Sequence, residues 1–376
     1  MVISTSKKLN KYARKASEIY AEGGIKGLET AATSKLTGYA LPVVYKNPLL
    51  NKVLYPKLKV VYLELTNKCN LSCKMCTYKV MQEATGYMSK SLFESCVDQL
   101  SQIGIDVLIL HFGGESLVHP DFSSYLKYAI YHRDHGGIGS VCWTDNGMLF
   151  NQAIADLVVD LGVDLIAFSI DGVGAVNDKI RLGSKYSVIE KNLKYLIEKR
   201  GNAKKPFVRL SMCDFGKTEE QKTDVYREWV PFVDSINLIP SILPDNSLEN
   251  MDEIKGSHNL VKPPAFCRFP FEMMGISWNG KVTGCCLDYI FKMALGDATQ
   301  ESLKQIWRGP KYRALREAAL KNVFPAGSPC HKCEFWQLNF EPKQEPVLDG
   351  KAIMKYGYLY RKIESPKEKS ERRKEV

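Results

Sequence analysis

The feature that most constrains the fold is a regular alternation of strand-like and helix-like segments between residues 59 and 239. Apolar, β-branched runs predict strands at Lys59–Thr66, Asp106–Phe112, Gly139–Thr144, Asp164–Ile170, Phe207–Cys213 and Ser235–Ile239. Amphipathic segments between them predict helices at Lys90–Ile103, Phe122–His135, Leu149–Leu161, Tyr186–Arg200 and Glu219–Trp229. Strands that alternate with helices form a parallel sheet, and six strands are fewer than the eight of a closed barrel. The sequence therefore predicts an α/β fold with a partial (β/α)6 TIM-like barrel.

The rest of the chain predicts further units around this barrel. We expect a basic helical extension and linker at 1–56, the barrel at 57–240, a linker at 241–262, a small C-terminal α+β domain at 263–345 and a basic tail at 346–376. The α+β domain is expected to hold a β-hairpin over Ile276–Cys286, with Asn279-Gly280 at its tip, and a helix near Ser302–Leu320. From Glu364 onward the tail has almost no apolar content, which predicts disorder.

The net charge of +10 is concentrated at the two ends of the chain, and residues 1–60 hold eleven Lys and Arg against three Glu. The tail lacks interleaved aromatic residues and the basic ends carry no recognisable nucleic-acid-binding motif, so we expect no nucleic-acid partner. The lysines of residues 7–15 can give peripheral contact with an anionic membrane, or can simply be solvated. The opening segment lacks the apolar core of a secretory signal, and no apolar run is long enough to span a bilayer. We therefore expect a cytoplasmic protein.

Three of the eleven cysteines lie on one short segment directly after the first predicted strand. Without an export signal, so many cysteines indicate metal ligation rather than disulfides. Cys69, Cys73 and Cys76 have the spacing Cys-x3-Cys-x2-Cys. Three thiolates at this spacing can hold three corners of a [4Fe–4S] cluster and leave one iron open to another ligand. A zinc loop that lacks its fourth ligand is the alternative.

With this cysteine loop, the sequence resembles the radical S-adenosylmethionine (SAM) superfamily. The resemblance extends to Gly113-Gly114-Glu115, which follows the second predicted strand and is similar to the family's Gly-Gly-Glu motif. It implies that a [4Fe–4S] cluster binds SAM and, once reduced by a partner such as flavodoxin or ferredoxin, cleaves it to a 5′-deoxyadenosyl radical. The residues expected to bind SAM on this basis are Met75, Gly113, Gly114, Glu115, Asn146, Ser169, Asp171 and Arg181. A plain turn at Asn146-Gly147 and a helix-capping Asp171 are the alternatives.

A second set of four cysteines lies in the C-terminal part of the chain, at Cys267, Cys285, Cys330 and Cys333. Four thiolates can close a [4Fe–4S] cluster or a tetrahedral zinc site. The pattern is similar to the SPASM and twitch auxiliary-cluster domains of the radical SAM superfamily. A full SPASM domain has further cysteines, and none follows Cys333. The resemblance therefore implies one auxiliary [4Fe–4S] cluster. His331, inside the last Cys-x2-Cys, is a further candidate ligand.

Two residues beside this set are candidates for catalysis. Cys286 can be an alternative ligand, a buried apolar residue or a thiol that donates hydrogen to a substrate radical. Asp288 can act as a general base or lie solvated on the surface. We expect His111 to have a structural role near the mouth of the barrel. Cys96, Cys142 and Cys213 fit the patterns of their helix or strands and are expected in the core.

The resemblance predicts an oxidoreductase whose radical abstracts hydrogen from a substrate carbon, with oxidation of an alcohol of a sugar-like or cyclitol substrate as the first choice. Radical epimerisation is the second. Peptide modification is a third, which is disfavoured because we expect no separate leader-recognition domain upstream of the barrel. An alternative from another class is a non-catalytic iron–sulfur or zinc protein. It explains the cysteines but leaves Gly113-Gly114-Glu115 without a role.

Overall fold

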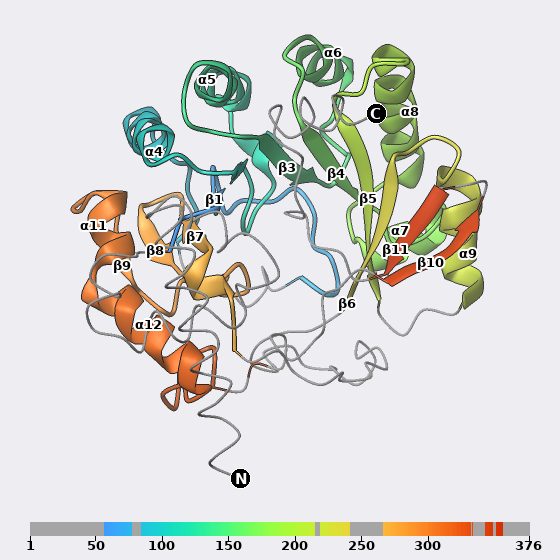
Figure 1. The fold of residues 1–376 in the computed structure, drawn as a ribbon. Coiled ribbons are helices and arrows are strands. Elements are labelled where there is room, and N and C mark those ends of the chain that lie inside the picture. Colours follow the sequence, from blue (N-terminus) through green and yellow to red (C-terminus); the bar gives the residue numbers. More distant parts are fainter. Residues whose placement is uncertain are drawn as a thin grey trace, which may run out of the picture.

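The computed structural model describes residues 56–76, 84–214, 219–240, 266–331, 333, 343–348 and 351–355. The predicted N-terminal extension up to residue 55, the linker at 241–262 and the tail from Glu364 lie outside these residues. Figure 1 shows a strongly curved sheet with helices along its outer side and a smaller helical unit at one end. This arrangement confirms the predicted mixed α/β class.

Six parallel strands form the central part of the sheet, in the order of the sequence. They are β1 (Val60–Leu63), β2 (Val107–Ile109), β3 (Val141–Asp145), β4 (Leu165–Ser169), β5 (Phe207–Asp214) and β6 (Ser235–Pro240). The helices between them are α4 (Lys90–Ile103), α5 (Phe122–His135), α6 (Gln152–Asp160), α7 (Ala175–Ile180), α8 (Tyr186–Arg200) and α9 (Glu219–Trp229). The partial barrel is therefore confirmed.

Local capping explains why some helix bounds match the prediction and others differ. The Ser89 side chain accepts from Leu92 N at the start of α4, and Gly104 ends that helix with a φ of 77°. The third helix was expected from Leu149, but α6 starts at Gln152 because the Asn151 side chain accepts from Ile154 N. The structure also adds the short helix α7, which the sequence did not predict.

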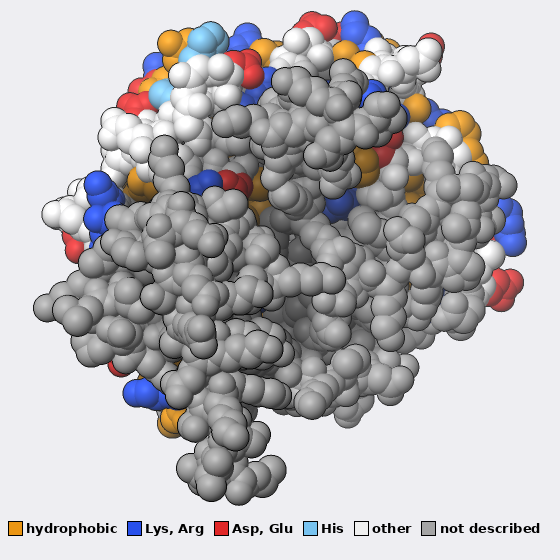
Figure 2. All heavy atoms as spheres, in the orientation of Figure 1, with side chains coloured by type: hydrophobic (Ala, Val, Ile, Leu, Met, Phe, Trp, Pro, Cys, Tyr) orange, Lys and Arg blue, Asp and Glu red, His pale blue; other side chains and the backbone are white. Residues whose placement is uncertain are grey.

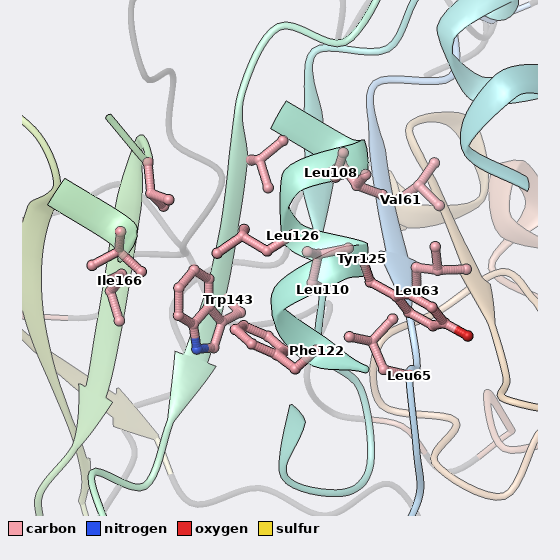
Figure 3. Packing of buried hydrophobic residues seen from close by; sticks show 14 of the residues in the cluster. Val61, Leu63, Leu65, Leu108, Leu110, Phe122, Tyr125, Leu126, Trp143 and Ile166 are labelled. Carbon is pink, nitrogen blue, oxygen red and sulfur yellow. The ribbon is translucent and has the colours of Figure 1, made fainter. Parts of the chain in front are cut away.

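The two faces of the sheet differ in what they contact. The outer face packs against the helices, and Figure 3 shows Phe122, Tyr125 and Leu126 of α5 against side chains of the neighbouring strands. The inner face carries alternate residues of the same strands, among them Tyr62, Cys142 and Ala167. The outer interface buries most of the large apolar side chains, and the inner face is left for other groups.

The C-terminal unit extends the same sheet. Its strands are β7 (Met273–Ile276), β8 (Lys281–Thr283) and β9 (Gly296–Asp297), and β7 runs parallel to β1 with Val60 opposite Met273. The antiparallel pair β7–β8 confirms the predicted hairpin, and Gly280 at its tip has a φ of 93°. This pairing fixes the C-terminal unit at the edge of the barrel next to the strand that precedes the cysteine loop.

The single helix predicted near Ser302–Leu320 is wrong, because two helices occupy this segment. They are α11 (Leu303–Arg308) and α12 (Pro310–Lys321), separated by Gly309 in an extended conformation. Proline has no N–H to continue the ladder of α11 and is favoured in the first turn of a new helix. The buried Tyr312 on α12 donates to Met273 O or Thr283 O, at 3.2 and 3.0 Å, so α12 packs beneath the hairpin.

The opposite edge of the sheet carries a second hairpin, β10 (Lys343–Leu348) and β11 (Lys351–Lys355), with β11 parallel to β6. This hairpin spans the predicted boundary between the α+β domain at 263–345 and the basic tail at 346–376. In the described part of the chain, no helix is both long and apolar enough to span a membrane. Figure 2 shows Lys, Arg, Asp and Glu side chains interspersed on the visible described surface. The residues proposed for membrane contact lie outside that part.

Candidate functional site

The three-cysteine loop leaves β1 and is held against the segment that follows α7. Ser72 N donates to Leu182 O at 2.8 Å, and Lys74 N donates to Ile180 O at 3.0 Å. Cys73 is buried, whereas Cys69, Met75 and Cys76 are half-buried. Burial raises the pKa of Cys69 to about 12. It also raises that of Cys73, and the Arg181 cation partly offsets this second shift. Soft thiol ligands on a fixed loop suit an iron–sulfur cluster, and loading it would release their protons.

The Gly113-Gly114-Glu115 segment braces the cysteine loop. Glu115 N donates to Lys68 O at 2.8 Å. A Cβ on Gly114 would lie 2.4 Å from both Thr66 O and Lys68 O, so only glycine fits there. Gly114 therefore makes room for the backbone of the cysteine loop. The predicted contact of Gly113 and Gly114 with SAM stays a prediction.

The Glu115 carboxylate is buried and accepts two backbone N–H groups. Leu117 N donates to Oε1 at 3.2 Å and Asn146 N donates to Oε2 at 2.9 Å. Burial and the nearby Asp145 carboxylate raise the pKa of Glu115 well above its ordinary value. Burial also raises that of Asp145 to about 6. A carboxylate has further lone pairs for an ammonium group, and the predicted contact of Glu115 with SAM stays a prediction.

Sequence reasoning missed Glu64, which joins three parts of the site. It is 2% exposed at the end of β1. Its Oε1 accepts from Gly113 N at 3.0 Å and its Oε2 accepts from Trp278 N in the C-terminal hairpin at 3.2 Å. A charged residue within an otherwise apolar strand was the available signal, because a buried carboxylate needs fixed donors.

Asn146, predicted to contact SAM, lies against the cysteine loop. Its Nδ2 donates to Asn70 Oδ1 at 2.8 Å, and its Oδ1 accepts from Met148 N at 3.0 Å. Asp145, which precedes this turn, accepts from Trp143 Nε1 and from Gly147 N. The structure therefore combines the turn at Asn146-Gly147 with a direct bond to the loop that carries the cysteines.

Asp171 and Arg181, predicted as separate SAM contacts, form a buried ion pair. Arg181 Nη2 lies 2.7 Å from Asp171 Oδ2, and the residues are 8% and 0% exposed. Asp171 Oδ1 accepts from Cys213 N at 2.8 Å. Asp171 does not cap α7, whose N-cap is Gly174. Ser169, at the end of β4, lies on the inner face of the sheet in register with Ser211.

The second set of cysteines surrounds one cavity. Cys267, Cys285, Cys330 and Cys333 all line it, together with Gly284 and Met293. Burial raises the pKa of Cys267 and Cys330, and each of these thiols also interacts electrostatically with Cys285. In the described residues, no three or more His, Cys, Asp or Glu side chains converge as ligands of a single metal ion. The cavity and its four thiols fit a cluster held entirely by protein.

The other C-terminal candidates take different positions. Cys286 packs on the inner face of the barrel with Tyr289 and Phe291. Asp288 is buried, not solvated, and accepts from Thr283 Oγ1, Lys292 N and Met293 N within its own loop. This geometry makes Asp288 an organiser of the loop, and its catalytic role stays a prediction. His331 is exposed and its Nδ1 lies 3.2 Å from Phe324 O.

The cysteines expected in the core divide into two groups. Cys96 and Cys142 are buried, as predicted. Cys213 is half-buried, and it interacts electrostatically with Arg181 and Tyr289. The core prediction for Cys213 is therefore wrong. In Phe207–Asp214 the apolar residues 208, 210 and 212 alternate with positions that face inward, and this period of two places Cys213 on the inner face.

His111 lies just beyond β2, where the sequence placed it. Burial lowers its pKa to about 4, so its imidazole is neutral at pH 7. Its buried Nδ1 has no hydrogen-bond partner in the described part of the chain. The expected role as a hydrogen-bonded structural histidine is therefore not supported at this nitrogen.

Two family models match the chain over the two parts described above. Residues 63–227 match the radical SAM superfamily, and residues 267–334 match SPASM, an iron–sulfur cluster-binding domain. Radical SAM domains bind a [4Fe–4S] cluster with SAM, and SPASM domains bind auxiliary iron–sulfur clusters. Both matches include the cysteines that the sequence singled out.

Curated relatives match across both domains. A tungsten-containing aldehyde ferredoxin oxidoreductase cofactor-modifying protein of Pyrococcus furiosus is 25% identical, over 74% of this chain and 89% of the relative. A SAM-dependent 2-deoxy-scyllo-inosamine dehydrogenase of Niallia circulans is 19% identical, over 77% of this chain and 98% of the relative.

Solved structures share the fold. Streptococcus suis SuiB bound to its precursor peptide SuiA superposes with a TM-score of 0.61 at 14% identity, and 86% of this chain and 83% of SuiB are covered. Native anSMEcpe with bound SAM has a TM-score of 0.56 at 16% identity, over 74% of this chain and 87% of that structure. These structures show the shared fold, and the two family models over residues 63–227 and 267–334 show that the chain belongs to the radical SAM superfamily and carries a SPASM-type iron–sulfur domain.

Proposed function

We propose that this radical SAM enzyme is an oxidoreductase that removes hydrogen from a carbon of a sugar-like or cyclitol alcohol and oxidises that alcohol to a ketone. Cys69, Cys73 and Cys76 would hold the first cluster, and Cys267, Cys285, Cys330 and Cys333 the second. When bound, SAM on the first cluster supplies a carbon-centred radical, and the second supplies an acceptor for the electron that oxidation releases.

The observation that carries this proposal is the four-thiol cavity beside the barrel. Four protein ligands leave no open iron for a substrate, so a cluster in this cavity is suited to electron transfer. The loop that follows Cys285 reaches the inner face of the barrel through Cys286, Tyr289 and Phe291. Tyr289 also interacts electrostatically with Cys76 of the first cysteine loop, which supports a location between the two cysteine sites.

The residues of the barrel would orient SAM and the substrate. The Asp171–Arg181 pair and the bond between Asn146 and Asn70 fix the loop against β3 and β4. The resemblance assigns contacts with SAM to Met75, Glu115 and Ser169 as well. Rigid placement of the reacting groups can contribute much of a rate enhancement, so these loop contacts are expected to matter for turnover.

Relatives support the substrate class, and two alternatives remain proposals. The dehydrogenase of Niallia circulans acts on 2-deoxy-scyllo-inosamine, as its name states, and aligns over nearly its whole length. The inward position of Cys286 favours epimerisation as a second candidate, because a thiol there can return hydrogen to a substrate radical. A PqqA peptide cyclase of Granulibacter bethesdensis is 24% identical over 72% of this chain, which supports peptide modification as a third.

The test uses anaerobically reconstituted full-length protein with dithionite as reductant, SAM, and 2-deoxy-scyllo-inosamine or myo-inositol in deuterated water. The proposal predicts 5′-deoxyadenosine together with a ketone. Return of the alcohol with deuterium on carbon would instead indicate epimerisation. If SAM is cleaved and neither compound changes, amino and neutral cyclitols are excluded as substrates. Flavodoxin and ferredoxin are the proposed physiological reductants, and either should replace dithionite.

A further inference from the structure

The inner face of the barrel carries a buried cation, Arg209 on β5, which is 5% exposed. In the described part of the chain no carboxylate forms an ion pair with it. Its Nε donates to Ser235 Oγ at 3.1 Å, but its buried Nη1 has no hydrogen-bond partner among the described residues. An unpaired buried charge is strongly unfavourable, because the interior does not replace the water that it loses.

A second unsatisfied polar group lies on the same strand. Ser211 is 4% exposed, and its buried Oγ has no hydrogen-bond partner within the ranges that the structure describes. Residues two apart on a strand point to the same face, so Arg209 and Ser211 are neighbours on the inner side. Buried polar groups in native proteins nearly always form hydrogen bonds. Two neighbouring groups that each lack one, Arg209 Nη1 and Ser211 Oγ, therefore indicate a ligand that supplies acceptors.

The neighbouring strand places short side chains beside these groups. Arg209 pairs with Ala167 in the register of β4 and β5, and Ser211 pairs with Ser169. Ala167, Ser169 and Ser211 all have short side chains. By contrast, β1 and β2 present Val60, Tyr62 and Ile109 on the same face. The inner face therefore has one apolar wall and one polar wall that includes the unpaired cation.

We propose that Arg209 and Ser211 form an oxyanion-binding subsite for the substrate, which takes a carboxylate or a phosphate group. A guanidinium group donates to either oxyanion in a forked geometry, and a serine hydroxyl can donate a further bond. This inference rests on the proposed function, and it makes the sugar-like or cyclitol alcohol an acidic one.

The subsite lies within reach of the cysteine loop, where SAM is proposed to bind. Cys213 is four positions beyond Arg209 on β5, which corresponds to about 13 Å between their Cα atoms. Cys213 lies beside the Asp171–Arg181 pair at the cysteine loop. An extended small molecule whose acidic group contacts Arg209 can therefore reach this loop with its other end.

The test compares inorganic phosphate, acetate and chloride at equal ionic strength as ligands of the reconstituted full-length protein, measured by thermal unfolding. Binding of phosphate or acetate should raise Tm above its value in chloride, and the more effective anion identifies the group that the subsite takes. Arg209→Gln should raise the apparent Kd at least tenfold, and Arg209→Lys should raise it less. Arg313→Gln, at an exposed arginine, is the matched control and should leave the Kd unchanged.

Two results would overturn the subsite. One is the same Tm of the unsubstituted protein in phosphate, acetate and chloride. The other is an apparent Kd for the oxyanion that Arg209→Gln leaves unchanged. In chloride alone, Arg209→Gln should have a higher Tm than the unsubstituted protein, because it removes an unpaired buried charge; a lower Tm also counts against the proposal. Reductive SAM cleavage is measured in parallel. Its absence in the unsubstituted protein would refute the enzyme, whereas cleavage without oxyanion binding would refute the subsite alone.

Discussion

Arg181 and Asp171 form a buried ion pair with 2.7 Å between Nη2 and Oδ2, and this contact connects the end of β4 with the three-cysteine loop. Arg181 also interacts electrostatically with Cys73, and Asp171 accepts the backbone N–H of Cys213. Two residues that the family pattern assigns to SAM therefore also stabilise each other. Their positions at the cysteine loop link cofactor binding with the integrity of the fold.

Arg181→Met should lower the free energy of unfolding by about 3 kcal/mol, because it leaves the Asp171 carboxylate buried without its cation. The double variant Asp171→Asn/Arg181→Met should recover part of that loss. Urea unfolding of the cluster-free protein measures both. The exposed pair Arg227–Asp224 provides the control, and Arg227→Met should cost less than about 1 kcal/mol. Equal losses of unfolding free energy in Arg181→Met and Arg227→Met would contradict the larger contribution expected of the buried pair.

Gly114→Ala should disrupt the first cluster site and spare the second. Its Cβ would meet two carbonyl oxygens at 2.4 Å, so the cysteine loop must move. After reconstitution we expect about four fewer iron atoms per chain, with the auxiliary signal retained. Gly104→Ala is the control for a strained alanine elsewhere in the fold, because Gly104 has a φ of 77° and no atom of the described residues lies within 4 Å of its Cβ position. Full iron content in Gly114→Ala would contradict the bracing role of this glycine.

Cys330→Ser/Cys333→Ser should remove the auxiliary cluster while SAM cleavage continues. The two residues line the C-terminal cavity, far along the chain from the first cysteine loop. Iron analysis should fall from about eight to about four atoms per chain. The yield of 5′-deoxyadenosine without substrate should stay within about twofold, whereas ketone formation should be lost. Retained ketone formation would exclude the second cluster as the electron acceptor.

The variant Cys286→Ala distinguishes two roles of the Cys286 thiol, apolar packing and donation of hydrogen to a substrate radical. If the enzyme oxidises an alcohol, this variant should still form ketone, because oxidation needs no returned hydrogen atom. If Cys286 donates hydrogen, turnover should fall by orders of magnitude while SAM cleavage persists. Cys96→Ala, a thiol buried on α4, controls for the loss of a small buried side chain. Ketone formation lost only in Cys286→Ala would contradict the oxidation account.

The central barrel could be predicted from the sequence because the patterns that define its helices and strands are local. Apolar periodicity, Ser89 at the start of α4 and Gly104 at its end determine that helix without distant contacts. The division between α11 and α12 also had a local signal, Gly309-Pro310, to which the sequence argument gave too little weight. The cysteine loop and the four later cysteines were accessible because ligand spacing is itself a sequence pattern.

Contacts between residues far apart in the chain were harder to predict from the sequence. The parallel pairing of β7 with β1 joins residues more than two hundred positions apart, and no local pattern indicates it. The two bonds of Glu64 and the pairing of Asp171 with Arg181 likewise depend on how loops meet in space. For Cys213 the alternation within β5 was sufficient, because it places residues 207, 209, 211 and 213 on one face.

The most direct test of the account is low-temperature electron paramagnetic resonance of the reconstituted, reduced protein with and without SAM. The same spectra are recorded for the triple variant Cys69→Ala/Cys73→Ala/Cys76→Ala. The account predicts one signal that shifts with SAM and disappears in the triple variant, beside a second signal that SAM does not affect. If no signal responds to SAM, or if the responsive signal persists without these three cysteines, the radical mechanism and its assignment to this loop are contradicted.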